Sequence, residues 1–426
     1  MGNLILKNAR QLVTCAGTAP RRGLDLGTVQ VIEDGALIVQ GGIIDMVGTT
    51  EAIEDKLAHG HWYEDPEEFT TIDASGQVVV PGFVDPHTHA CFTGYRHDEV
   101  ELRLGGRKYL DILAAGGGIL STVQKVRDCE EGVLAEETYR RLLLMLSLGT
   151  TTVEVKSGYG LDLESELKIL RAIAKAAEMA REQLTVVPTF MGAHAVPREL
   201  KSEPGEYVER LCREMIPRVA ESGLARYCDV FCEEEVFGPV QARRILKTAQ
   251  EHGLGAKIHA DEIGECGALD VAVELGAASA DHLLVTGEAG IRKLADSETC
   301  AVLLPGTAFC LRSGRYAAGR RMVDQGCAVA LATDCNPGSC FTESMPLVMA
   351  MACFGMGLTP AEALNAATIN ASHAIGLADQ LGSLEEGKAG DLVLLDSPDY
   401  RHLVYHFGIN QVGMVVKKGE IVYVRD

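Results

Sequence analysis

Pro81-Gly82-Phe83-Val84-Asp85-Pro86-His87-Thr88-His89 is the stretch of this 426-residue chain that decides the fold. It extends an apolar run that begins at Val78 and ends in two histidines, two positions apart. We expect residues 78–84 to form a buried strand. Because side chains alternate along an extended backbone, His87 and His89 should point to the same side. Two converging imidazoles supply half of a zinc or iron site, although the motif alone also fits two solvated loop histidines.

Further short apolar segments follow, with helical patterns between most of them. One such pattern covers residues 206–220 and places its apolar residues on a single face. Continuous apolar strands are typical of a parallel sheet buried on both faces. The segments are Thr151–Val155, Thr185–Phe190, Asp229–Cys232, Ala256–His259, Ser279–Leu283, Ala301–Leu304 and Val329–Ala332. Repeated β-then-α units predict an α/β fold, a (β/α)8 TIM barrel. A doubly wound open sheet is the alternative, but no G-x-G-x-x-G follows the first strand.

Both ends of the chain contain short β segments. Residues 43–47 follow residues 35–39 across Gly41-Gly42, which predicts a hairpin, and residues 391–395 and 412–424 contain similar runs. Neither end is long enough for a core of its own. We therefore expect residues 1–77 and 386–426 to join into one small β-sandwich domain, with the barrel, residues 78–385, inserted between them.

The composition excludes several classes of partner. The formal net charge is −21, with 60 acidic against 39 basic residues, which argues against binding nucleic acid or an anionic membrane. The 13 cysteines include no C-x-x-C pair, and the first residues do not resemble a secretory leader. No apolar run reaches the ~18 residues of a membrane-spanning helix. These features predict a cytoplasmic protein with free thiols.

Polar residues follow several of the predicted strands. His259 ends the fifth, His282 follows the sixth and Asp334 follows the eighth. Each should lie at the carboxyl-terminal mouth of a barrel, where active sites occur. Buried imidazoles and carboxylates are costly unless something pairs with them, and a metal ion would do so.

These positions identify the chain as similar to the amidohydrolase superfamily, over its whole length. More specific segments resemble the imidazolonepropionases within it: residues 116–123 (GGGILSTV), 154–160 (EVKSGYG), 259–262 (HADE) and 334–339 (DCNPGS). The resemblance implies a metal held by His87, His89, His259 and Asp334, and a homodimer. Dinuclear relatives carry a carboxylated lysine after strand four, and none follows here. We therefore expect one Zn²⁺ or Fe ion per chain, with the choice between them left open.

Two charged segments near the site have plainer interpretations. Lys156 follows the second strand and is interpreted as a structural or loop cation. The run Glu233-Glu234-Glu235 follows the fourth strand and is interpreted as a solvated loop edge, although one of its members could enter the mouth.

The resemblance also implies the substrate, 4-imidazolone-5-propanoate, a flat ring with a carboxylate tail. Its contacts are expected from Arg96, Tyr159 and His194, from Glu262, and from the loop residues Asn336, Gly338 and Ser339. A carboxylate tail favours a forked cation and hydroxyl donors. Arg96 by itself is better interpreted as an ordinary surface arginine, and only the resemblance favours the contact with the tail, whereas for Tyr109 both interpretations stay open.

The expected reaction is hydrolysis of the ring amide to N-formimidoyl-L-glutamate by a metal-activated water. Asp334 should orient or deprotonate the water, His282 should act as base or stabilise the oxyanion, and Glu262 should bring a proton to the leaving nitrogen. The division of roles between His282 and Glu262 stays open. The first rival is a mononuclear deaminase of a pyrimidine or purine ring. The second is a non-catalytic assembly protein, which typically loses metal ligands that this chain retains.

Overall fold

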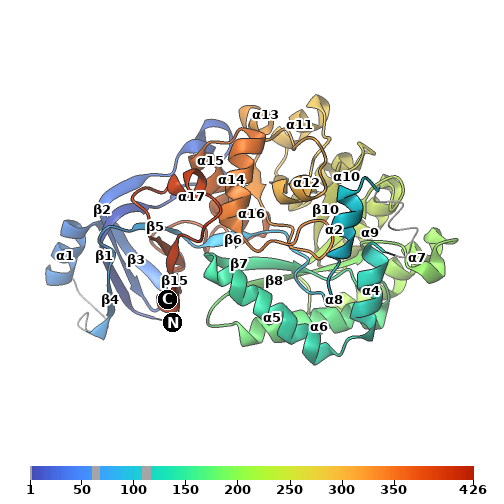
Figure 1. The fold of residues 1–426 in the computed structure, drawn as a ribbon, viewed down its shortest axis with the longest axis horizontal. Helices are drawn as coiled ribbons and strands as arrows, with labels where there is room; N and C mark the ends of the chain where they lie inside the picture. The colour runs from blue at the N-terminus through green and yellow to red at the C-terminus, as the bar shows by residue number, and fades with distance from the viewer. Residues whose placement is uncertain (1, 60–67, 108–116) are drawn as a thin grey trace.

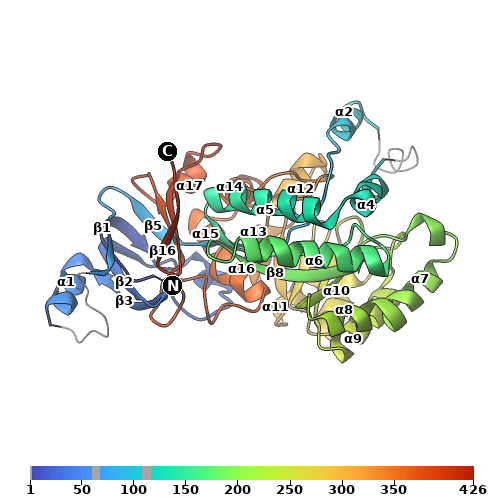
Figure 2. The same cartoon turned by 90° about the horizontal axis from the view of Figure 1, so that it is seen from below.

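The computed structural model describes residues 2–59, 68–107 and 117–426. Two sheets organise them: a mixed sheet built from both ends of the chain and a parallel sheet that curves into a barrel. The two bodies lie side by side in both views, with helices packed around the barrel (Figures 1 and 2).

The parallel sheet confirms the predicted TIM barrel. Neighbouring strands pair in sequence order and in parallel, as expected when each strand is followed by a helical return. The strands are β6 (Phe83–Asp85), β7 (Thr150–Lys156), β8 (Thr185–Ala193), β9 (Tyr227–Cys232), β10 (Gly255–Ala260), β11 (Ser279–His282), β12 (Cys300–Leu303) and β13 (Val329–Leu331). Between the first and last strands, Thr88 and Cys335 form an isolated parallel bridge. The alternative of an open doubly wound sheet is therefore wrong.

Helices fill the intervals between the barrel strands. The first interval holds α2 (Asp98–Leu104), α4 (Ile119–Asp128) and α5 (Glu131–Ser147). The next hold α6 (Leu163–Met179), η3 (Arg198–Leu200), α7 (Pro204–Arg210), η4 (Leu211–Met215), α8 (Ile216–Ser222), α9 (Pro239–Glu251), α10 (Ala268–Glu274) and α11 (Glu288–Ala295). Between β12 and β13 lie α12 (Pro305–Cys310) and α13 (Gly319–Asp324), and the last strand, β13, is followed by α14 (Met345–Met356), α15 (Pro360–Ala366) and α16 (Ile369–Ala374).

The helix predicted over residues 206–220 is present but contains a π-helical turn, η4. Pro217 is the second residue after that turn. Proline has no backbone N–H, so it cannot donate the i→i−4 bond that would continue a regular α-helix.

The terminal segments share one mixed eight-stranded sheet, so the predicted union of the two ends is confirmed. Its strands are β1 (Leu4–Val13), β2 (Val31–Gln40), β3 (Ile43–Thr49), β4 (Thr70–Asp73), β5 (Val78–Pro81), β14 (Leu392–Leu395), β15 (Val412–Lys417) and β16 (Glu420–Val424). The short elements η1 (Gly23–Gly27), α1 (Thr50–His59) and α17 (His402–Tyr405) complete this part. Leu4 and Leu6 from one end pack with Leu392 and Leu394 from the other in a single apolar cluster.

The single strand predicted over residues 78–84 is two strands. β5 pairs with β1 and β14 in the terminal sheet, whereas β6 pairs with β7 in the barrel. The chain passes between the sheets at Gly82, where a Cβ atom would collide with the Thr151 side chain. The division of the chain at residues 77 and 386 stays a prediction. Among the described residues, no helix is long and apolar enough to cross a membrane.

Candidate metal and catalytic site

The candidate site lies at the seam where the barrel closes. His89 N–H donates to Cys335 O at 3.0 Å, and Asp334 N–H donates to His87 O at 3.1 Å. These bonds bring the ends of β6 and β13 together, although their residues are far apart in the sequence. The carboxyl ends of parallel strands gather at one face of a barrel, so side chains at these positions meet at the mouth.

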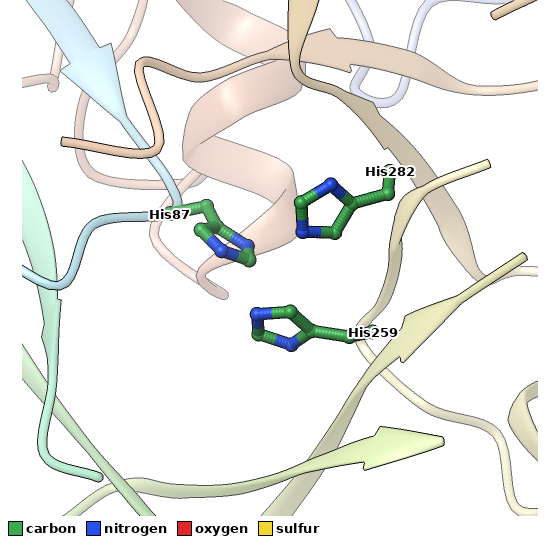
Figure 3. A group of neighbouring side chains, drawn as sticks. All are labelled: His87, His259 and His282. Atoms are coloured by element: carbon green, nitrogen blue, oxygen red, sulfur yellow. The ribbon is translucent and has the colours of Figure 1, made fainter. Parts of the chain in front are cut away.

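Four predicted ligands converge there. His87 Nε2 and His89 Nε2 lie 3.5 and 3.7 Å from Asp334 Oδ1, and His259 Nε2 lies 3.4 Å from His89 Nε2. His87, His89 and Asp334 form one compact group of ligand atoms, and His87, His259 and His282 form another. Figure 3 shows the second group, with three imidazoles from three different strand ends turned toward one another.

The donor set fits a transition metal. His87 Nε2 is buried and has no hydrogen-bond partner among the described residues. Burial and the positive charge of Lys156 hold the pKa of His87 well below its usual value, and burial acts in the same way on His89. For His259, burial opposes protonation but the Asp229 carboxylate outweighs it and raises the pKa. Neutral imidazoles and one carboxylate are suitable ligands for Zn²⁺ or iron.

Buried carboxylates behind the imidazoles orient them. His87 Nδ1 lies 2.6 Å from Asp281 Oδ2, and His259 Nδ1 lies 3.0 Å from Asp229 Oδ1. Each carboxylate accepts the Nδ1 proton and so leaves Nε2 free to bind a cation, an arrangement common around metal-binding histidines.

Lys156 sits among these carboxylates with its side chain fully buried. Its ammonium group lies 2.8 Å from Glu154, 2.8 Å from Asp229 and 3.8 Å from Asp281. Lys257, also fully buried, donates to Pro86 O at 2.7 Å and lies 3.3 Å from Glu154. The interpretation of Lys156 as a structural cation is consistent with this position, but sequence reasoning missed that it balances the carboxylates which orient the ligands.

The backbone at the strand ends is unusual. Asp334, His282 and Asp261 have φ values of +53°, +78° and +51°, in the left-handed region that residues other than glycine rarely adopt. Such conformations cluster at functional sites, where the surrounding structure holds them in place.

Glu262 and His282 face each other beside the ligand cluster. His282 Nε2 lies 3.7 Å from Glu262 Oε2. Both line a cavity of about 80 Å³, whose other walls include Leu304, Ala308 and Met356. Burial raises the pKa of Glu262 to about 8, with the Asp334 carboxylate adding to the shift, whereas burial lowers that of His282.

Arg96, Tyr159 and His194 lie near the ligand histidines or the loop beside them. The His194 ring stacks on His89, with centroids 4.8 Å apart and an interplanar angle of 20°, and the Tyr159 centroid lies 5.4 Å from His194. Burial lowers the pKa of His194 to about 3, and the charges of His259 and Arg96 act in the same direction. The Arg96 guanidinium is forked onto the Glu99 carboxylate at 3.0 and 2.8 Å. It is 9% exposed, so it is no ordinary surface arginine.

The loop after β13 is held by its own asparagine. Asn336 Oδ1 accepts the N–H groups of Gly338 and Ser339 at 2.8 and 2.7 Å. Gly338 lies against the Arg96 guanidinium, which a Cβ atom at this position would strike. The loop and Arg96 are thus packed together. Tyr109, the remaining predicted contact, lies outside the described residues.

The interpretation of residues 233–235 as a solvated loop edge is wrong for its first member. Glu233 is 4% exposed, and its carboxylate accepts the backbone N–H groups of Glu262, Ile263 and Gly264. Glu234 and Glu235 are not buried. In the sequence these glutamates differ only in that Glu233 directly follows the apolar strand, a weak signal for a buried acceptor.

Comparison with known proteins decides the family. The model of the amidohydrolase family matches residues 78–422. Imidazolonepropionases from Clostridium tetani and Symbiobacterium thermophilum are 46% and 49% identical to the chain, over 99% of it and 98% and 97% of their own lengths. The chain belongs to the amidohydrolases, among the imidazolonepropionases. An imidazolonepropionase from a Geobacillus species is 49% identical, with coverage of 99% and 98%.

Solved structures of amidohydrolases share the fold. An adenosine deaminase from Xanthomonas campestris with bound zinc superposes with a TM-score of 0.70 at 19% identity, covering 99% of this chain and 93% of its own. Guanine deaminase from E. coli gives a TM-score of 0.72 at 17% identity, with both chains fully covered. At these identities the likeness shows the fold alone. For this family the ligand cluster implies a metal ion.

Proposed function

We propose that this chain hydrolyses the ring amide of 4-imidazolone-5-propanoate to N-formimidoyl-L-glutamate. The observation that carries the proposal is the convergence of three imidazoles and Asp334 at the barrel mouth, in a chain similar to imidazolonepropionases along its whole length. A non-catalytic assembly protein would have no need of this cluster.

We propose one metal ion per chain, zinc or iron, held by His87, His89, His259 and Asp334. When bound, such an ion polarises a water molecule and lowers its pKa toward neutrality. His87 and His89, whose pKa values are held low by burial, would bind the ion as neutral imidazoles.

The remaining steps belong to the chain's own residues. Asp334 faces the cluster through Oδ1, while its Oδ2 accepts from Thr307 Oγ1 at 2.5 Å, so its orientation is set. We propose that Asp334 orients the attacking water and receives its proton. His282 stabilises the developing oxyanion or assists as a base.

We assign Glu262 as the acid that protonates the leaving ring nitrogen. Its pKa, raised to about 8 by burial, keeps a proton on the carboxyl at neutral pH. An acid of this strength matches the operating pH, which favours proton transfer. Cleavage of the C–N bond then places the negative charge of the departing nitrogen next to a proton donor.

We propose that Arg96 and Tyr159 hold the carboxylate tail and that His194 lies against the ring. The supporting observation is the packing of Tyr159 and His194 beside His89, with Arg96 against the loop that follows Asp334. Asn336, Gly338 and Ser339 form that loop, and we propose that the loop contacts the substrate. We also propose a homodimer located in the cytoplasm.

The test is to incubate purified protein with 4-imidazolone-5-propanoate and follow the loss of the ring absorbance. We expect turnover with formation of N-formimidoyl-L-glutamate, and none with Asp334→Asn. If the protein instead released ammonia from a pyrimidine or purine ring and left imidazolonepropanoate intact, it would be a deaminase.

A further inference from the structure

A buried carboxylate joins the ends of two neighbouring barrel strands. Glu233 follows β9, and the loop that contains Glu262 follows β10. Glu233 Oε1 accepts from Glu262 N and Ile263 N, each at 2.9 Å, and Oε2 accepts from Gly264 N at 3.2 Å. One side chain thus holds three consecutive amides of a loop about thirty residues away.

The loop is anchored on its other side as well. Thr286 Oγ1 donates to Asp261 Oδ2 at 2.8 Å, and Val285 N–H donates to Asp261 O at 3.0 Å. Asp261 itself lies in the left-handed region, at φ +51°. The backbone around Glu262 is therefore held on one side by Glu233, which follows β9, and on the other by the segment after β11.

The Glu233 carboxylate is buried inside the fold and is directed at this loop. Glu233 is 4% exposed, and both of its carboxylate oxygens accept hydrogen bonds from the loop. Burying a carboxylate is unfavourable unless it accepts hydrogen bonds. Because this carboxylate accepts its bonds from three amides of one loop, it fixes the geometry of that loop.

We propose that Glu233 is a positioning residue for Glu262. It fixes the backbone from which the Glu262 carboxyl reaches the space beside His282, and it takes no part in the chemistry itself. This inference rests on the proposed function only in the role given to Glu262. Proton transfer requires hydrogen-bond reach, and a misplacement of about 1 Å can cost on the order of 100-fold in rate.

A double-mutant cycle separates positioning from general structural support. Glu233→Met keeps the length of the side chain and removes both acceptors, and Glu234→Met is the matched control on the exposed neighbour. We expect Glu233→Met to lower kcat roughly 10- to 100-fold with KM and metal content almost unchanged. In a Glu262→Gln background, the same substitution should change kcat by less than about twofold, since coupled residues are not additive.

Two further measurements keep the proposal testable. Hydrogen exchange of the peptide covering residues 261–267 should be faster in Glu233→Met and unchanged in Glu234→Met, and this readout does not depend on any activity. Glu233→Gln, which keeps one carbonyl acceptor, should retain more activity than Glu233→Met and replaces it in the cycle if the methionine variant does not fold. An equal loss of kcat in both backgrounds, a loss of metal, or unchanged exchange would overturn the proposal.

Discussion

The backbone N–H of Asp334 donates to the carbonyl oxygen of His87 at 3.1 Å, across the seam between the last and first barrel strands. This bond couples closure of the barrel to assembly of the candidate metal site, since both residues are proposed ligands. A substitution that disrupts this closure should therefore also lower the metal content. Substitution of a proposed ligand side chain should leave the rest of the barrel folded.

Metal content provides the first prediction. Substituting His87, His89, His259 or Asp334 by Ala should remove most of the metal or nearly abolish turnover, because each is proposed to supply one ligand atom. His252→Ala, at the exposed position directly after α9, is the matched control and should behave as wild type. Elemental analysis of the purified variants is the measurement. Two metals per chain, or full activity of a metal-free preparation, would contradict the mononuclear proposal.

Lys156→Met should be strongly destabilising. It leaves Glu154, Asp229 and Asp281 without the ammonium group that separates them. Breaking a buried ion pair by removing one partner typically costs about 3 to 5 kcal/mol in the free energy of unfolding. Urea denaturation measures this change, and Lys175→Met, on an exposed lysine, is the control. Metal affinity should fall roughly 10- to 100-fold in protein that still folds, because Asp229 and Asp281 orient two ligands. Unchanged stability would show that the network is dispensable.

The rate should fall on the alkaline side of the pH profile. Burial raises the pKa of Glu262 to about 8, so the proton-donating form is present at lower pH and is lost as the pH rises through the pKa. A bound cation favours the carboxylate, so the fall should lie at or below pH 8. Glu262→Gln should lower kcat by ~10² to 10⁴-fold, retain the metal and abolish this fall. His282→Asn should also retain the metal and lose rate, but it should keep the fall. A rate that increased through this range in wild type would instead make Glu262 a base.

Arg96→Met should lower kcat/KM only for substrates that carry the carboxylate tail. Truncating one partner of a charge-assisted pair costs ~2 to 5 kcal/mol, or roughly 30- to 5,000-fold in kcat/KM. For a ring substrate without the tail the loss should be far smaller, and metal content should not change.

The bidentate ion pair between Arg96 and Glu99 requires a control of its own. Arg96→Met leaves a buried carboxylate without its cation, so the comparison should be repeated in Arg96→Met/Glu99→Gln. If both substrates were weakened equally in the double variant, Arg96 would be structural. The measurement is kcat/KM for each protein with each substrate.

Strand order, the barrel and the placement of polar residues at the strand ends were predictable from local patterns, whereas the choice of the proposed ligands among them came from the family resemblance. His87, His259, His282 and Asp334 each stand at or just after the end of a short apolar segment. Because all strands of a parallel barrel run in the same direction, the residues at their carboxyl ends lie at the mouth. The split of residues 78–84 at Gly82 was not predictable, since both halves are equally apolar and only their partners differ.

The sequence by itself determined which residues stand at the strand ends, and so the chemistry of the proposed ligand set. Tertiary structure alone decided which charged side chains are buried beneath them. Lys156 and Glu233 look like any solvated charge in the sequence, yet one lies among three carboxylates and the other accepts three amides. Burial of a charge depends on partners supplied by distant strands, and no local pattern of residues contains that information.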